Sequence, residues 1–321
     1  ADDNGDFWSQ ITVGTTPINV GEGYIVRPQS GYTDPANTNF YMTYSQGTLN
    51  NGDVTRSTVF NGLGTNPDGT PNVYSNPYAS AISGTDFINA NSLVNELYFW
   101  EHLTPPSPAI PGYGSINFSM GDISMFNLTM PLPAANDPGT STTPNGIIST
   151  GQGFGIKAFG NGSVTFTNAM RQTTGNTTLR GPQENKDLIT LKVFSPEYEI
   201  GSFTGIGFTQ TGTPGIDPGY DSNRLATAIS LYSHLLDGTQ QLGIQTREAF
   251  ESGIKVPMGF ASQVDAEIEF TISIVDIVGE HLNSATVYLF DHHANTITNL
   301  SQQDYIFKSD KGEFNERFTV L

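Results

Sequence analysis

Residues 266–274 read AEIEFTISI, with an apolar side chain at every second position from Ala266 to Ile274. Successive side chains of a β-strand point to opposite faces of its sheet, so a period of two gives one apolar and one polar face. The stretch therefore predicts a strand with one face on a core and the other in water.

Similar patterns occupy most of the chain. Short apolar runs rich in β-branched and aromatic residues are bounded by Gly, Pro, Asn or Asp, which is typical of strands joined by turns. The clearest hairpin spans Phe40 to Phe60, where Asn51-Gly52 tolerates the positive φ of a type I′ turn. We predict an all-β fold made of two consecutive antiparallel β-sandwich domains, of the jelly-roll or immunoglobulin-like kind.

The length of 321 residues exceeds what one hydrophobic core usually serves. A polar, turn-rich stretch at 171–187 separates two strand-rich halves, and the predicted domains are residues 1–186 and 187–321. Two stretches depart from the β pattern. Residues 84–91 fit one helical turn with Thr85 as its N-cap, and residues 224–236 fit a helix or a strand, of which we favour the strand.

The composition restricts the partners of the protein. Charged residues make up 14%, and 13 Lys+Arg against 31 Asp+Glu give a net charge of -18. With so few charged residues, most of the surface is expected to be polar and uncharged. The net negative charge repels phosphate backbones and anionic lipids, so we expect no nucleic-acid partner. The sequence has no cysteine and no apolar run of about 18 residues, which excludes disulfides and predicts no transmembrane segment.

A set of short motifs follows a fixed order along the chain. Three of them are Ser75-Asn76-Pro77-Tyr78-Ala79-Ser80-Ala81, Phe87-Ile88-Asn89-Ala90-Asn91 and Leu97-Tyr98-Phe99-Trp100-Glu101-His102-Leu103-Thr104-Pro105. The others lie at 21–27, 151–154, 164–171, 220–221, 242–245, 256–259 and 314–318.

These motifs resemble the GNPYPSA…FINAN…LYFWTHNTP signature of large cell-surface proteins of the Bacteroidota. The chain departs from that signature at Ser75 and Ala79, and from the family's later glycine motif at Gly155. The resemblance implies export by the type IX secretion system, an extracellular position on the bacterial cell surface and an adhesin-like role. It implies a location more than an activity.

The motifs have a structural interpretation. Asn76-Pro77 sets a turn because proline fixes φ and restricts the residue before it, and Tyr78 and Trp100 are expected to pack as bulky aromatic side chains. Gly151 and Gly153 are expected in a strand that a neighbour approaches closely.

No group of catalytic residues converges in the sequence, so we predict that the protein is not an enzyme. His292 and His293 follow Asp291, but adjacent side chains of an extended stretch point in opposite directions and cannot share an ion. We expect a solvated loop there. His102, His234 and His281 have no spaced partners and are expected at the surface or satisfied in the core.

Calcium is the predicted metal because acidic loops supply hard oxygen ligands. The candidate ligands are Asp217 and Asp221 in one turn, and Asp2 and Asp6 near the N-terminus. In each case the alternative is a solvated turn.

We predict a structural or adhesive module of an extracellular bacterial surface protein. Its partners would be other copies or modules of that protein, joined at sheet edges into a filament. The alternative is a glycan-binding module, because 11% of the residues are aromatic and the sequence leaves open whether Trp8, Trp100 or Tyr113 is exposed.

Overall fold

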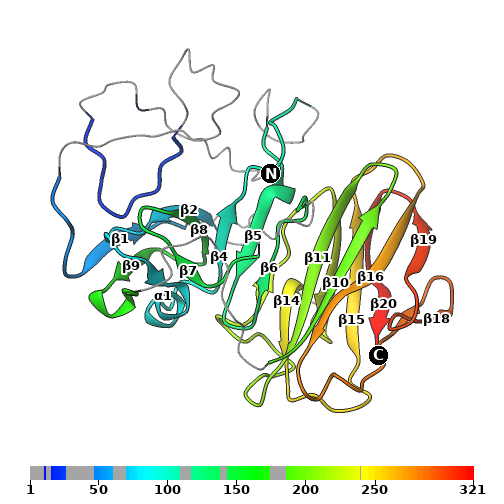
Figure 1. Cartoon of the computed structure of the whole chain (residues 1–321). Coiled ribbons are helices and arrows are strands. Elements are labelled where there is room, and N and C mark those ends of the chain that lie inside the picture. The colour runs from blue at the N-terminus through cyan, green and yellow to red at the C-terminus, as the bar shows by residue number, and fades with distance from the viewer. Residues whose placement is uncertain are drawn as a thin grey trace.

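The computed structural model describes residues 11, 16–26, 47–60, 70–108, 117–137, 143–173, 186–238 and 240–321. Over these residues the chain forms strands, one short α-helix and two short 3-10 helices. Figure 1 shows two groups of strands side by side, one from each half of the chain. The predicted all-β class is confirmed.

The second half forms one large sheet. Its strands are β10 (Asp187–Ser195), β11 (Ile200–Phe208), β12 (Ser222–Asn223), β13 (Ile229–His234), β14 (Gln241–Arg247), β15 (Val256–Ser262), β16 (Ile268–Val278), β17 (Tyr288–Asp291), β18 (Thr296–Asn299), β19 (Tyr305–Ser309) and β20 (Gly312–Val320). Their order is β18-β17-β20-β15-β13-β14-β11-β10-β16-β19, with β12 beside β14. The pair β11 and β14 is parallel and the other pairs are antiparallel.

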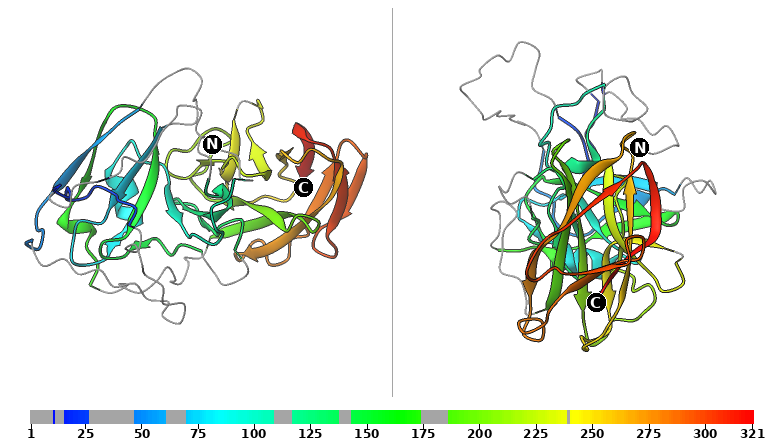
Figure 2. Two further views of the ribbon diagram at one scale, coloured as in Figure 1. Left: turned by 90° about the horizontal axis from the view of Figure 1, so that it is seen from above. Right: turned by 90° about the vertical axis from the view of Figure 1, so that its right-hand side faces the viewer.

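The alternating stretch at 266–274 lies mostly in β16, as predicted. Ile268, Phe270 and Ile272 are buried, whereas Glu267 and Glu269 are exposed. The sheet folds over so that the apolar faces of β10, β11 and β16 share one core with those of β13, β15 and β20 (Figure 2). The ring of Phe270 meets that of Phe260 from β15 edge-on, with centroids 4.8 Å apart.

The first half forms a five-stranded sheet and two ribbons. The sheet order is β2-β8-β4-β5-β6, and the ribbons are β1-β9 and β3-β7. The bounds are β1 (Val54–Thr58), β2 (Thr70–Ser75), β3 (Ile82–Ser83), β4 (Leu97–Trp100), β5 (Ile123–Phe126), β6 (Pro131–Leu132), β7 (Ile147–Ile148), β8 (Gly153–Ala158) and β9 (Gly162–Phe166).

The single α-helix in the described residues is α1 (Gly84–Ala90), and the two 3-10 helices are Met120–Asp122 and Asn168–Met170. Its position agrees with the sequence prediction, but its N-cap is Ser83 rather than Thr85, since the Ser83 hydroxyl accepts the N–H of Asp86 at 3.1 Å. Phe87 is fully buried and packs on Phe166 with ring centroids 4.8 Å apart, so the helix covers the core of the first half.

The turn at Asn76-Pro77 is confirmed. The Asn76 side chain donates to the carbonyl oxygens of Ser80 at 2.8 Å and Ile148 at 3.1 Å, and it accepts the N–H of Tyr78 at 3.0 Å. Tyr78 is buried, as expected of a packing residue. Asn76 therefore ties this turn to strand β7.

Several predictions for local structure are corrected. Gly151 has a φ of 67° in a turn before β8 and has open space around it, so it lies in no closely approached strand. A Cβ atom at Gly153 would lie 3.7 Å from the Tyr74 carbonyl oxygen, which is ordinary contact. The hairpin arm at 40–46 lies outside the described residues, so the hairpin stays a prediction, and the other arm forms β1, which pairs with β9. The favoured strand within 224–236 is confirmed as β13.

The two halves meet where the turn Asn127–Met130, between β5 and β6, lies on the outer face of β11. A Cβ atom at Gly207 would overlap Cγ2 of Thr129, and one at Gly205 would overlap Sδ of Met130. These two glycines therefore create the space in which the turn sits.

The junction also has an apolar cluster of its own. Met125, Met130 and Leu132 from the first half pack with Leu188 and Ile244 from the second. Among the described residues, no strand before residue 187 pairs with a strand after it. The apolar cluster, by contrast, contains residues from both halves. The two sandwich domains and their boundary stay a prediction.

We predict that Gly207→Ala weakens the junction. The added methyl group overlaps a stiff, β-branched Thr129, and such overpacking costs about 1–3 kcal/mol. Urea unfolding followed by circular dichroism measures the loss. Gly155→Ala is the matched strand control, because its Cβ atom would find its nearest neighbour at 3.6 Å. Equal stability of the two variants would show that the close approach at β11 is unimportant.

Candidate functional site

The predicted calcium residues fall into two groups. Asp2 and Asp6 lie outside the described residues. Asp217 and Asp221 are described, and each carboxylate accepts hydrogen bonds from the chain itself. Asp221 accepts the N–H groups of Thr246 at 2.6 Å and Asp217 at 2.8 Å, and Asp217 accepts the N–H of Thr213 at 2.7 Å.

The loop at 217–222 connects the two halves. The Leu128 N–H donates to the Gly219 carbonyl oxygen at 2.8 Å, and the Asn127 side chain donates to that of Tyr220 at 2.6 Å. Asp221 holds this loop against β14 through Thr246. In the part of the chain that the structure describes, no group of three or more His, Cys, Asp and Glu is placed to hold a metal ion.

The histidines are dispersed. His292 and His293 are exposed after β17, and the Asp291 carboxylate turns inward, where it pairs with Arg317 at 3.3 Å. His281 is exposed and pairs with Asp187 at 2.7 Å. His234 is buried and makes a hydrogen bond through Nδ1 to the Leu235 carbonyl oxygen at 2.9 Å, whereas its Nε2 has no partner among the described residues.

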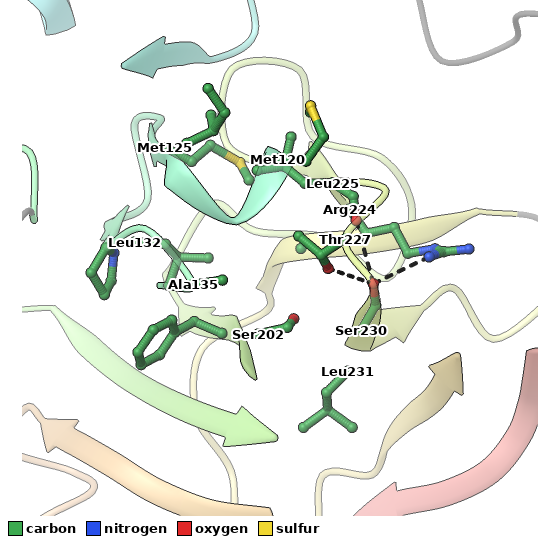
Figure 3. A pocket seen from close by; sticks show the side chains of 14 residues that line it. Met120, Met125, Leu132, Ala135, Ser202, Arg224, Leu225, Thr227, Ser230 and Leu231 are labelled. Atoms are coloured by element: carbon green, nitrogen blue, oxygen red, sulfur yellow. Dashed lines mark hydrogen bonds between the residues drawn. The ribbon is translucent and has the colours of Figure 1, made fainter. Parts of the chain in front are cut away.

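A pocket lies at the junction between the halves (Figure 3). The space inside it is about 30 Å³, roughly that of one water molecule. Its lining is largely apolar, with Met120, Ile123 and Leu132 from the first half and Phe203 and Leu225 from the second. Hydroxyl groups of Ser202, Thr227 and Ser230 add polar points.

Arg224 borders this pocket, but its charge is already neutralised. Figure 3 shows the guanidinium group pointing away from Leu132 and Ala135. It donates to Glu313 at 2.8 Å and to Ser230 at 3.3 Å, and it stacks 4.7 Å from the ring centroid of Tyr232. The pocket therefore offers no unpaired cation from Arg224 to an anionic ligand.

An exposed aromatic cluster lies beside the pocket. It consists of Trp100, His102 and Phe118, and we call it the aromatic cluster. The centroid of the Trp100 ring lies 4.9 Å from that of His102 and 4.8 Å from that of Phe118. Trp100 is 37% exposed and Phe118 is 46% exposed. Large apolar rings in a group at the surface indicate a contact site.

Strand pairing places this cluster next to the pocket. Trp100 of β4 pairs with Ile123 of β5, and Tyr98 pairs with Met125 two positions further along. Directly paired residues project from the same face of a sheet. Since Ile123 and Met125 line the pocket, the indole ring continues the same surface.

The backbone around the cluster is held in place. Thr104 donates through its N–H at 2.9 Å and its hydroxyl at 3.0 Å to the buried carboxylate of Asp122, and Asn136 donates to the same group at 2.8 Å. The Glu101 N–H donates to the Asp122 carbonyl oxygen at 2.8 Å. His102, between these anchors, has a φ of 46°, a strained value for a residue other than glycine.

The sequence predicts Trp100 as a packing residue like Tyr78 and leaves its exposure open. In the structure it is 37% exposed at the end of β4 and packs against His102 and Phe118. Phe118 and the pairing of Trp100 with His102 were missed. The sequence feature that could have indicated the cluster is the close spacing of Trp100 and His102 at the end of an apolar strand. The same spacing is equally compatible with core packing.

Two buried carboxyl groups lie near the junction. Glu96 is only 1% exposed and accepts the hydroxyl of Tyr98 at 2.8 Å, and the neighbouring Asn95 accepts the N–H of Gly219 at 3.2 Å. Burial raises the pKa of Glu96 to about 7, although the Tyr98 hydroxyl and the charge of Lys157 act against this. Burial also raises the pKa of Asp221 to about 7.

One family model, described as a domain of unknown function (DUF8693), matches residues 3–321. No curated protein and no solved structure matches the chain. The arrangement of the side chains is therefore the main guide to function.

We predict that Glu96→Gln changes how stability depends on pH. Folded Glu96 keeps its proton up to about pH 7 and the unfolded chain releases it near pH 4.5, so ionisation destabilises the fold as the pH rises between those values. At about 1.4 kcal/mol per pKa unit, the glutamine variant gains about 3 kcal/mol over the parent at pH 8 and nothing at pH 4. Urea unfolding at both pH values measures the difference.

The control is Glu267→Gln, which removes an exposed carboxylate before β16. It should leave the pH profile of the parent unchanged. If the stability of Glu96→Gln changes with pH in the same way as that of the parent, Glu96 is ionised in the folded protein.

Proposed function

The chain belongs to the DUF8693 family, and we propose that it is a non-catalytic adhesive module of a bacterial cell surface that contacts its target through the aromatic cluster. The observation that carries this proposal is the exposure of Trp100 and Phe118 on a backbone fixed by Asp122. Rings that are already held in place lose little conformational freedom on binding.

The sequence supports the location. The ordered motifs from Asn76 to Pro105 resemble those of Bacteroidota surface proteins, for which export by the type IX system and an extracellular position are expected. The surface is rich in neutral polar residues and has a net charge of -18. Among the described residues, no helix is long and apolar enough to span a bilayer.

The buried acidic residues support a role without chemistry. Asp122 and Asp221 accept hydrogen bonds from side chains or backbone groups of the chain itself, and Asp291 pairs with Arg317 and accepts the Tyr305 hydroxyl at 2.8 Å. Carboxylates engaged in this way hold loops in place and are poorly placed to transfer protons to a substrate.

A second candidate function is self-assembly through sheet edges. The large sheet ends in strands β18 and β19. Ile297 on β18 is 63% exposed and Ile306 on β19 is 58% exposed. Edge strands with exposed apolar side chains can recruit a strand of another copy, which agrees with the structural role expected from the sequence.

Adhesion is tested with beads that display the full chain. Retention under flow is counted on a panel of bacterial, algal and epithelial cell layers. We expect Trp100→Ala combined with Phe118→Ala to abolish retention wherever the parent chain is held. Tyr288→Ala, which removes a 39% exposed aromatic ring from β17, should leave retention unchanged. Undiminished retention of the double variant would refute the role of the aromatic cluster.

Self-assembly is tested by light scattering after size exclusion and by electron microscopy. We expect the parent chain to form higher-order species at high concentration. Ile297→Lys and Ile306→Lys should shift them to monomers, since a lysine on an edge strand blocks pairing. Monodisperse monomers of the parent at every concentration would rule out this second function.

A further inference from the structure

We propose that the aromatic cluster forms a binding site for a neutral carbohydrate chain. This inference rests on the proposed adhesive function and names the class of its target. Three features carry it, namely the exposed rings, the imidazole group of His102 among them and the net negative charge of the chain.

The exposed rings suit a sugar. A pyranose has an apolar face of C–H groups and a rim of hydroxyls, so it binds where a flat aromatic surface lies near hydrogen-bonding groups. Trp100 and Phe118 supply two such surfaces at an interplanar angle of 73°. One sugar unit can lie on the indole ring while the next meets Phe118.

The hydrogen-bonding side chain within the cluster is His102, whose imidazole nitrogens can bind the hydroxyl rim of a sugar ring. The hydroxyls of Thr227 and Ser230 in the pocket are already engaged, because Thr227 donates to the Ile229 carbonyl oxygen at 2.6 Å and Ser230 accepts from Arg224 at 3.3 Å.

Charge selects against anionic glycans and nucleic acids. Arg224 is bound to Glu313 and Ser230, and the chain has a net charge of -18. A uronate, sulfate or phosphate group approaching the aromatic cluster would be repelled by the net negative charge of the chain. Among glycans, the neutral ones are therefore favoured.

The size of the cluster selects against a large protein partner. A specific protein interface buries about 800 Å² on each side, whereas one aromatic side chain buries about 150–250 Å². Three rings that are partly covered by one another fall well below that area. The pocket beside them has room for about one water molecule, so it does not enlarge the site.

The test begins with the full chain on an array of neutral and anionic glycans. The neutral probes are hexaoses of β-1,4-glucan, β-1,3-glucan, xylan and mannan, and the anionic probes are polygalacturonate and heparin oligosaccharides. We expect binding to at least one neutral probe and to no anionic probe. Because the chain has two tryptophans, Trp8→Phe leaves Trp100 as the single emitter, and its fluorescence should change on titration with the bound probe.

Variants then locate the site. Trp100→Ala and Phe118→Ala should each weaken the bound probe at least tenfold, whereas Trp100→Phe should retain part of the affinity and guard against misfolding of the alanine variant. Tyr288→Ala is the matched control and should bind like the parent. Equal weakening by Tyr288→Ala would overturn the assignment of the site.

Two further outcomes separate this inference from the proposed function. Binding to anionic probes alone, or to no probe, overturns the carbohydrate inference, and if bead retention is still lost in the Trp100 and Phe118 double variant, the adhesive function stands with a peptide or protein target. If bead retention is unchanged in that variant, the aromatic cluster is not the contact site and both proposals fail.

Discussion

The structure depends on the close approach of the turn Asn127–Met130 to strand β11. Gly205 and Gly207 leave two successive positions on the outer face of that strand without side chains, and Thr129 and Met130 fill the space. Hydrogen bonds from Leu128 and Asn127 to the loop at 217–222 close the contact. An apolar cluster from both halves then packs around this contact. The arrangement of the two groups of strands therefore depends on the absence of side chains at Gly205 and Gly207.

This junction also creates the candidate site. The hairpin that carries the turn begins with β5, and β5 pairs with β4, which ends at Trp100. Fixing the hairpin on β11 therefore fixes the indole ring at the edge of the pocket. Asp122, at the start of β5, holds the segment that follows Trp100 through Thr104. The residues that pack the two halves together therefore also fix the position of Trp100.

The sequence predicted the elements better than their partners. The period of two identified β16, because alternation depends only on the local backbone, and the helix at 84–90 was found from residues close in sequence. The pairing of β1 with β9 and the role of Asp221 depend on residues about 25 to 110 positions away, which no local pattern encodes. The calcium prediction for Asp217 and Asp221 rests on their carboxylate oxygens, and the same oxygens can accept backbone N–H groups, as both residues do here. The exposure of Trp100 was left open by the sequence because the end of an apolar strand can be covered or open, and only the junction decides which.

The path of the last strand has a mechanical consequence for a protein that holds on to a target. Strand β20 pairs with β15 on one side and β17 on the other, and Leu321 exchanges hydrogen bonds with Tyr288 at 3.0 and 2.9 Å. Tension applied between Leu321 and Trp100 would cross the β20 ladder, then the core, and finally the turn at β11. When tension runs along β20, its two ladders are loaded in shear and their hydrogen bonds resist together. The turn at β11 is held by a few side chains, and it is the point at which such a chain would yield first.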